Sequence, residues 1–276
     1  MCEYCVQHGS GKRWYENARN FSKELATSEY VKEFCDSYFG RDVKPGSVEI
    51  DAKPEFKTPE SFELERQKID HRYKKYLHHQ VVTTDEAKSI LKLASEQTEE
   101  HERTVVRIPC ICRHVVSGSD ENLHCYGIAF TNEYTRHFPK YLGGGHDYVS
   151  AETAIHMLDE MVEREKTVHA ISALGVPYLG LLCNCDMKIC QPYLKRVTFE
   201  VDRAFHKGHY AASVDLQKCS DCGTCETVCP FNAASLRPSE SGASIDLESC
   251  FGCGVCINRC SEGAISLVEA PRTTGF

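Results

Sequence analysis

Residues 214–236 read VDLQKCSDCGTCETVCPFNAASL, and 31 residues further along the chain residues 245–267 read IDLESCFGCGVCINRCSEGAISL. Ten of the 23 aligned positions are identical, among them all four cysteines and the glycine inside each cysteine run. Each copy has the spacing C-x2-C-x2-C-x3-C. This internal repeat decides the fold of the C-terminal part of the chain.

The cysteine spacing also indicates the chemistry of the repeat. Three thiolates on a tight loop, which glycine permits, can reach three corners of one iron–sulfur cube. The fourth points away at the start of a helix and binds the cube of the other copy. Paired all-thiolate zinc sites are the alternative, but zinc favours two C-x2-C pairs separated by a longer loop. The predicted ligands are Cys219, Cys222, Cys225 and Cys260 for one [4Fe–4S] cluster, and Cys250, Cys253, Cys256 and Cys229 for the second.

The repeat region resembles the bacterial two-cluster ferredoxins over about a quarter of the chain. Pro230 follows the last cysteine of the first copy, as in that family, whereas the second copy has Ser261 there, which leaves its turn less rigidly set. The resemblance implies one-electron transfer at low potential between two clusters that lie close together. Such a domain makes no bonds itself, so the remaining residues must indicate what the electrons are for.

The composition narrows the class of protein. The chain has 276 residues, 17 of them cysteine, with 41% apolar and 26% charged residues and a formal net charge of −8. These values exclude full disorder and disfavour a nucleic-acid partner. No apolar run is long enough to span a membrane, and the first residues lack the pattern of a signal peptide. We therefore expect a cytoplasmic protein whose cysteines bind metal rather than form disulfides.

The first sixty residues carry weaker signals. Residues 1–40 are expected to form a helical segment with an aromatic stripe at Phe21, Tyr30, Phe34 and Tyr38, and residues 41–60 a linker with three prolines. The segment opens with Cys2-x2-Cys5-x2-His8, which is one ligand short of a structural zinc site. These three residues either complete a site elsewhere or leave free thiols near the terminus.

Residues 61–210 are expected to form a cysteine-rich α/β or α+β domain, so that with the ferredoxin-like domain of residues 211–276 the fold class is α+β. A charged helix over residues 62–79 carries His71, His78 and His79, which we expect to be solvated. Thr83 to Glu86 predicts a capping box before the apolar spacing of the next helix. Short β-like runs follow at residues 105–110, 126–130, 168–171 and 178–183, with a helix over residues 151–166 that Ser150 caps.

Six cysteines in this domain predict a third metal centre. Residues i and i+2 of an extended segment point to the same side, so each C-x-C pair presents two sulfurs. Thiolate softness favours an iron–sulfur cluster or Zn²⁺, and buried thiols without metal are the remaining alternative. Nearby Arg113, His114 and His124 could donate hydrogen bonds to sulfur. The simplest ligand set is Cys110, Cys112, Cys183 and Cys185, with Cys125 and Cys190 as substitutes or additions.

The most direct hypothesis for function is electron transfer through two [4Fe–4S] clusters and a third metal centre to a redox partner protein, such as a larger oxidoreductase. No G-x-G-x-x-G follows a predicted strand, so a dinucleotide cofactor is not supported. The alternatives are a reductase whose active site is the six-cysteine centre, and a redox sensor or cluster carrier. The whole chain also looks like the anaerobe proteins in which a two-cluster ferredoxin is fused to a cysteine-rich domain.

Overall fold

The computed structural model describes residues 3–21, 29, 58–96, 105–117, 123–128, 146–174, 178–236 and 242–270. Most of the predicted aromatic stripe and residues 41–57 of the predicted linker lie outside these ranges. The fold is α+β, as the sequence predicted, with one large antiparallel sheet and two small ones. Within the described ranges, no helix has the length and apolar character that crossing a membrane requires.

The large sheet has six strands in the order β1-β5-β6-β3-β2-β4, and every neighbouring pair is antiparallel. The predicted β-like runs form β2, β3, β5 and β6, which confirms them as strands. Alternation along β6 sends Leu182 into the main core and Cys185 into a second apolar cluster on the opposite face. The strand bounds are β1 Leu77–Val81, β2 Val105–Ile108, β3 Cys125–Ile128, β4 Asp147–Val149, β5 Val168–Leu174 and β6 Leu179–Cys185.

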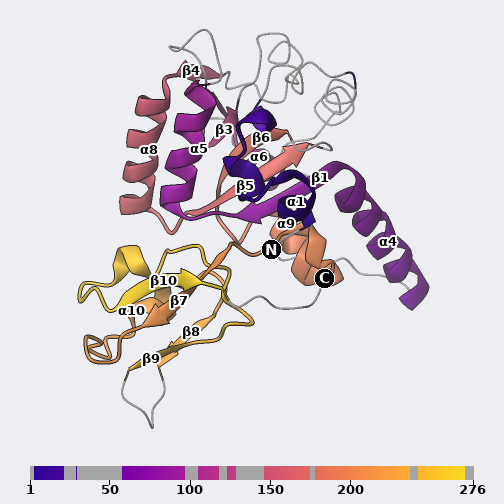
Figure 1. The fold of residues 1–276 in the computed structure, drawn as a ribbon. Coiled ribbons are helices and arrows are strands. Elements are labelled where there is room, and N and C mark those ends of the chain that lie inside the picture. Colours follow the sequence, from indigo (N-terminus) through magenta and orange to yellow (C-terminus); the bar gives the residue numbers. More distant parts are fainter. Residues whose placement is uncertain are drawn as a thin grey trace.

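Helices α5 (Thr84–Glu96) and α8 (Ala151–Arg164) lie side by side over one face of this sheet (Figure 1). Both begin where the sequence predicts. The Glu86 carboxylate accepts from the Thr83 amide at 2.8 Å, while the Thr83 hydroxyl accepts from the Glu86 amide at 3.1 Å. Ser150 caps α8 through the Thr153 amide at 3.1 Å. Leu91 and Leu158 are fully buried between the helices and the sheet, and each contributes about 2 kcal/mol.

The charged helix predicted over residues 62–79 ends earlier in the structure than the sequence predicts. Helix α4 covers Pro59–Tyr76, with a capping box at Thr58, and the chain then continues directly into strand β1. Pairing with β5 buries every residue of β1, so His78 and His79 are 4% and 7% exposed. The prediction that they are solvated is wrong, whereas His71 is exposed on α4 as expected.

The remaining short elements surround the sheet. Helices α6 (Ile111–Ser117) and α9 (Gln191–Phe199) each begin next to a cysteine, Cys110 and Cys190. The N-terminal segment contributes α1 (Glu3–His8) and the 3-10 turns η1 (Trp14–Glu16) and η2 (Ala18–Phe21), and η3 (Asp202–Ala204) follows α9. Trp14 and Tyr15 are buried, so the N-terminal segment is part of the core.

The two copies of the repeat pair crosswise. Strand β7 (Tyr210–Val214), which opens the first copy, pairs with β10 (Ile265–Glu269) at the end of the second. Strand β8 (Ala234–Leu236), at the end of the first copy, pairs with β9 (Ala243–Ile245) at the start of the second. The short helices α10 (Thr224–Val228) and η4 (Ile257–Arg259) occupy equivalent positions. This region forms the orange and yellow part of Figure 1.

Hydrogen bonds fix the repeat region against the large sheet and its helices. The Arg259 guanidinium donates to the carbonyls of Val162, Glu163 and Glu165 at 2.8–3.2 Å, which caps the C-terminus of α8. Lys166 donates to the Thr227 carbonyl at 2.9 Å. Each part thus donates hydrogen bonds to the other at the C-terminal end of α8. These bonds fix the position of the cysteine loops relative to the sheet.

Gly252→Ala tests the closest backbone approach in the repeat region. A Cβ at Gly252 would lie 2.0 Å from the Tyr210 carbonyl oxygen, and the residue has φ +70°, so we expect a loss of about 2–4 kcal/mol of unfolding free energy. Gly254→Ala is the control, because Gly254 has φ +79° but its nearest neighbour would be a Leu267 methyl at 3.9 Å. Urea unfolding of both variants checks the difference, and equal losses would contradict it.

Candidate iron–sulfur sites

The crosswise pairing of the repeats forms two hollows, each lined by four cysteines from both copies. The first is lined by Cys219, Cys222, Cys225 and Cys260. The second is lined by Cys229, Cys250, Cys253 and Cys256. In each set the fourth cysteine comes from the other copy, so the two groups of four coincide with the ligand sets predicted from the spacing.

Backbone amides point at sulfurs in both hollows. The Ala233 amide donates to Cys229 Sγ at 3.2 Å, and the equivalent Ala264 amide donates to Cys260 Sγ at 3.3 Å. The Ala212 amide approaches Cys250 Sγ at 3.5 Å. Donors of this kind stabilise thiolates, so the hollows fit the donor set that a [4Fe–4S] cluster requires.

The two hollows differ in their exposure to solvent. Cys222 is exposed, and hydrogen bonds from Thr224 lower the pKa of its thiol. In the second hollow, burial raises the pKa of the Cys253 thiol well above its ordinary value and that of Cys256 to about 12. The first hollow therefore has an exposed cysteine, whereas the four cysteines of the second hollow are all partly buried.

An aromatic cluster borders the second hollow. Phe231 and Phe251 stack with ring centroids 4.2 Å apart, and Tyr193 from α9 meets both edge-on at 5.3 and 5.9 Å. The same apolar cluster includes Cys253 and Cys256 of the second hollow, and also Cys185 and Cys190 of the cysteine-rich domain. A continuous cluster of apolar side chains thus joins the second hollow to the six cysteines predicted to form a third centre.

Those six cysteines form a closed ring of thiol–thiol contacts, which we call the six-thiol ring. The pKa of each thiol is shifted by two of the others, which lie close enough to interact with it, and none of the six is in a disulfide. The four-cysteine set predicted as simplest is present, but Cys125 and Cys190 are full members of the ring rather than substitutes. The order around the ring is Cys110, Cys112, Cys190, Cys185, Cys183, Cys125 and back to Cys110.

Four different segments supply the ring. Cys183 and Cys185 alternate on β6 as predicted, and Cys125 opens the neighbouring strand β3. Cys110 and Cys112 are not an extended pair, because Cys112 lies in the first turn of α6. The prediction of an extended C-x-C there is wrong, since the chain turns into a helix directly after Cys110.

Interactions between neighbouring thiols shift the pKa of every cysteine in the ring. Contacts with neighbouring thiols lower the pKa of Cys110, Cys183 and Cys190, and they raise the pKa of the three thiols between them. The Gln191 amide at the start of α9 donates to Cys112 Sγ at 3.3 Å. The Arg113 guanidinium lowers the pKa of Cys110 further. Thiolates with such donors are suited to binding soft metals.

No single-ion site accompanies these clusters of cysteines. Within the described ranges, no group of three or more His, Cys, Asp and Glu side chains is arranged to hold one metal ion. The thiolates of an iron–sulfur cluster bind different iron atoms, so their sulfurs need not converge on one point. Of the three predicted neighbours of the ring, Arg113 lies beside Cys110 and donates to the Asn184 carbonyl at 3.1 Å. His124 is partly buried near Arg113 and Cys110, and His114 is fully buried.

Comparison with known families agrees with the geometry of the repeat region. Residues 218–264 match the family model described as a 4Fe-4S dicluster domain. The C-terminal region is thus of the iron–sulfur, ferredoxin-like electron-transfer type, and its cysteines bind 4Fe-4S clusters. A search of curated proteins found no match to the chain.

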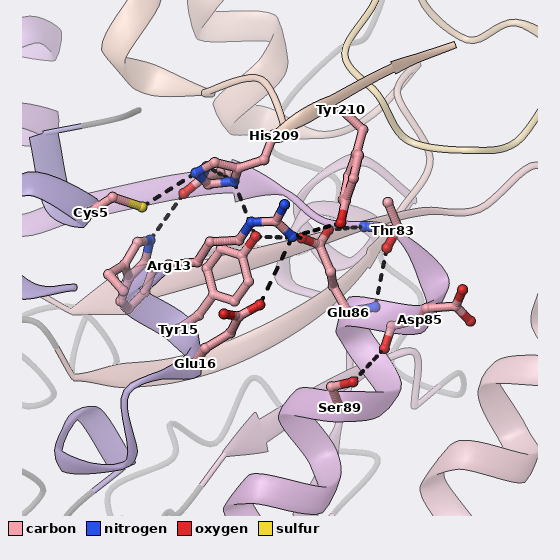
Figure 2. Close-up of polar contacts among 12 residues, drawn as sticks. Cys5, Arg13, Tyr15, Glu16, Thr83, Asp85, Glu86, Ser89, His209 and Tyr210 are labelled. Carbon is pink, nitrogen blue, oxygen red and sulfur yellow. Dashed lines mark hydrogen bonds and ion pairs between the residues drawn. The ribbon is translucent and has the colours of Figure 1, made fainter. Parts of the chain in front are cut away.

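The N-terminal segment forms a buried polar network at the junction with the repeat region (Figure 2). Cys5, which is 3% exposed, lies 3.3 Å from His209 Nε2, and the Tyr15 hydroxyl lies 3.1 Å from His209 Nδ1. Of the predicted Cys2, Cys5 and His8 set, only Cys5 meets a partner from a distant part of the chain here. His8 is only partly buried, and Cys2 lies outside the described residues.

Glu86 is the central anion of this network. Its carboxylate accepts from Arg13 at 2.5 Å and from the Tyr15 hydroxyl at 2.6 Å, and Arg13 also donates to the Tyr210 hydroxyl at 2.9 Å (Figure 2). Burial, and then the neighbouring Glu86 carboxylate, raises the pKa of Tyr15 well above its ordinary value. The network therefore joins the N-terminal segment, helix α5 and the first residue of β7.

Sequence reasoning overlooked the buried histidines. His78 stacks on Tyr4 at 4.1 Å and on His206 at 4.3 Å, and burial lowers its pKa well below its ordinary value. His79 bonds to Ser172 on β5, and burial lowers its pKa despite the nearby thiols of Cys183 and Cys190. The run of residues Leu77, Val81 and Val82 after the charged helix was the signal for a strand there.

Glu86→Gln tests the polar network. The amide cannot accept from all three donors and carries no charge against Arg13, so we expect a loss of about 2–4 kcal/mol in unfolding free energy. Glu16→Gln is the matched control, because Glu16 faces the same arginine at 3.9 Å from an exposed position and should change stability by less than about 0.5 kcal/mol. Similar urea midpoints for both variants would contradict the central role of Glu86.

His169→Gln tests the effect of buried histidines on acid stability. Burial lowers the pKa of His169 to about 4 from 6.5, so protons bind first to the unfolded chain as the pH falls. Between pH 6.5 and 4 the natural protein should lose about 3 kcal/mol that the variant does not lose. His156→Gln, an exposed position on α8, should leave the pH dependence unchanged. Parallel stability–pH curves for all three proteins would contradict the assignment.

Proposed function

We propose that the protein carries electrons between a redox partner protein and an interior metal centre by way of two [4Fe–4S] clusters. The ligand sets we propose are Cys219, Cys222, Cys225 and Cys260 in the first hollow, and Cys229, Cys250, Cys253 and Cys256 in the second. Support comes from the two four-cysteine hollows and from the family match over residues 218–264. Clusters bound there would supply one-electron transfer at low potential.

The third centre is proposed at the six-thiol ring, and the closed ring is the observation that carries it. Thiolates suit both zinc and an iron–sulfur cluster, and the neighbouring [4Fe–4S] site in the same apolar cluster favours the iron–sulfur cluster. The ring also belongs to the same apolar cluster as the second hollow, through Cys185 and Cys190. Phe231, Phe251 and Tyr193 pack against one another within this apolar cluster.

The redox partner is proposed to dock over the first hollow. Cys222 is exposed there. Leu216 is 60% exposed, and its side chain lies beside Gly242, near Cys219. The second hollow is bordered by the aromatic cluster, and its four cysteines are partly buried. A larger oxidoreductase that presents its own redox centre to this surface fits the arrangement best.

A reductase is the second candidate function. Cys112 and Cys183 are the two partly buried members of the six-thiol ring, so a small substrate has an approach to the ring at either of them. Turnover of a small oxidant without any protein partner, abolished by replacing ring cysteines, would favour this candidate over electron transfer alone.

Metal analysis of cysteine variants tests the third centre. We expect about eleven or twelve iron atoms per chain in the natural protein purified without oxygen, eight of them in two cubes. The double variant Cys125→Ser, Cys185→Ser removes the two ring members on either side of Cys183 and should retain about eight. Cys222→Ala should lose one cube and keep the iron of the ring. Iron and zinc content, with EPR of the reduced protein, measures all three.

Cys5→Ser is the control for these variants, because Cys5 is a buried cysteine outside both hollows and the ring. It should leave the iron content unchanged. About eight irons in the natural protein, with no further loss in the double ring variant, would contradict a third iron–sulfur centre. One zinc per chain, lost in the double variant, would replace the cluster with a zinc site.

A further inference from the structure

Two buried polar side chains lie beside the six-thiol ring without belonging to it. His79 on β1 and Ser172 on β5 are register partners across the sheet. His79 Nδ1 and Ser172 Oγ form a short hydrogen bond. Ser172 Oγ in turn lies 3.9 Å from Cys183 Sγ, within reach of a hydrogen bond to the large sulfur atom. The three residues form a chain from β1 through β5 to the ring on β6.

The chemistry of the three groups fixes the direction of this chain. A metal-bound thiolate has no proton and can only accept, so Ser172 uses its one hydrogen to donate to Cys183 Sγ. The serine oxygen is then an acceptor, and the His79 Nδ1–H donates to it. The histidine holds the serine hydroxyl in the orientation that points its hydrogen at sulfur. His79 is thus a positioning residue, and Ser172 is the donor.

Packing alone does not require this pair. Ser172 is fully buried, and its neighbours along β5 include Ala170, Ile171 and Ala173, so a small apolar side chain would suit the strand. Burying a hydroxyl and an imidazole costs free energy unless each has a hydrogen-bond partner. The hydrogen bond between His79 and Ser172 is therefore better explained by the contact of Ser172 with Cys183 than by packing.

The opposite side of the ring also receives a donor. The Gln191 amide donates to Cys112 Sγ at 3.3 Å. Cys112 and Cys183 lie opposite each other in the ring order, so both sides of the ring have a hydrogen-bond donor from outside it. Donors to cluster sulfurs stabilise the more negative, reduced state and so raise the reduction potential.

We propose that Ser172, oriented by His79, donates a hydrogen bond to the metal-bound Cys183 thiolate and raises the reduction potential of the third centre. The proposal rests on the proposed function, because it requires an iron–sulfur cluster in the six-thiol ring. It adds two residues, from β1 and β5, that set how readily that centre accepts an electron.

Potentiometric titration of full-length protein, followed by EPR, tests the proposal. Ser172→Ala should lower the midpoint potential of the third centre, while the potentials of the two cubes and the iron content stay unchanged. Ser244→Ala is the matched control, since Ser244 bonds to Ser235 in the β8–β9 sheet rather than to a ring sulfur. It should move none of the three potentials.

Two variants of His79 provide an independent readout. Asparagine can place an amide N–H near the position of Nδ1, so His79→Asn should keep the potential closer to that of the natural protein than His79→Leu does. A purely structural role would change stability or iron content, but it would not give this order of potentials. These variants also serve if Ser172→Ala fails to assemble the third centre.

The outcomes separate the two levels of the argument. If the natural protein holds only about eight irons, the proposed third centre is wrong, and this inference falls with it. If the third centre is present but Ser172→Ala retains its iron and its potential, the inference alone is wrong. Equal potentials for His79→Asn and His79→Leu would likewise overturn the role of His79.

Discussion

The stacked pair of Phe231 and Phe251 is the contact on which the arrangement of the sites depends. Phe231 follows the last cysteine of the first repeat copy, and Phe251 lies between two cysteines of the second, so both rings are fixed by the loops of the second hollow. They pack against Tyr193 of α9 and against the face of the sheet that carries Cys185. With Val228 and Val255 they form the apolar contact between the repeat region and the cysteine-rich domain.

The local features of the chain were predictable from sequence. The cysteines of each repeat copy lie within eleven residues of one another, and their spacing alone gives both four-cysteine groups. The capping boxes and the β-like runs are equally local, because a cap or an alternating strand depends on residues close in sequence. The six cysteines predicted for a third centre lie together in the six-thiol ring, where Cys125 and Cys190 are full members rather than substitutes or additions. Their places depend on the pairing of β3 with β6 and on where α9 begins.

Contacts between distant residues account for what the sequence did not reveal. Cys5 meets a histidine 204 positions away, and no pattern near either residue indicates the pair. His78 and His79 follow a helix rich in lysine and arginine, so polarity suggested that the helix continued. Only the pairing of β1 with β5 buries both histidines and brings His79 to Ser172. In each case the contact depends on a segment far away in the sequence, so residues near it give no sign of it.

Arg259 in the second repeat copy has a consequence for how the protein forms during synthesis. Arg259 satisfies three carbonyls at the C-terminus of α8, a helix that ends 95 residues earlier. Those carbonyls have no partner from this arginine until almost the whole chain has left the ribosome. The last turn of α8 therefore reaches its final form late, together with the loop that carries Cys256 and Cys260. Completion of the sheet's helical cover and assembly of the second repeat copy are one event.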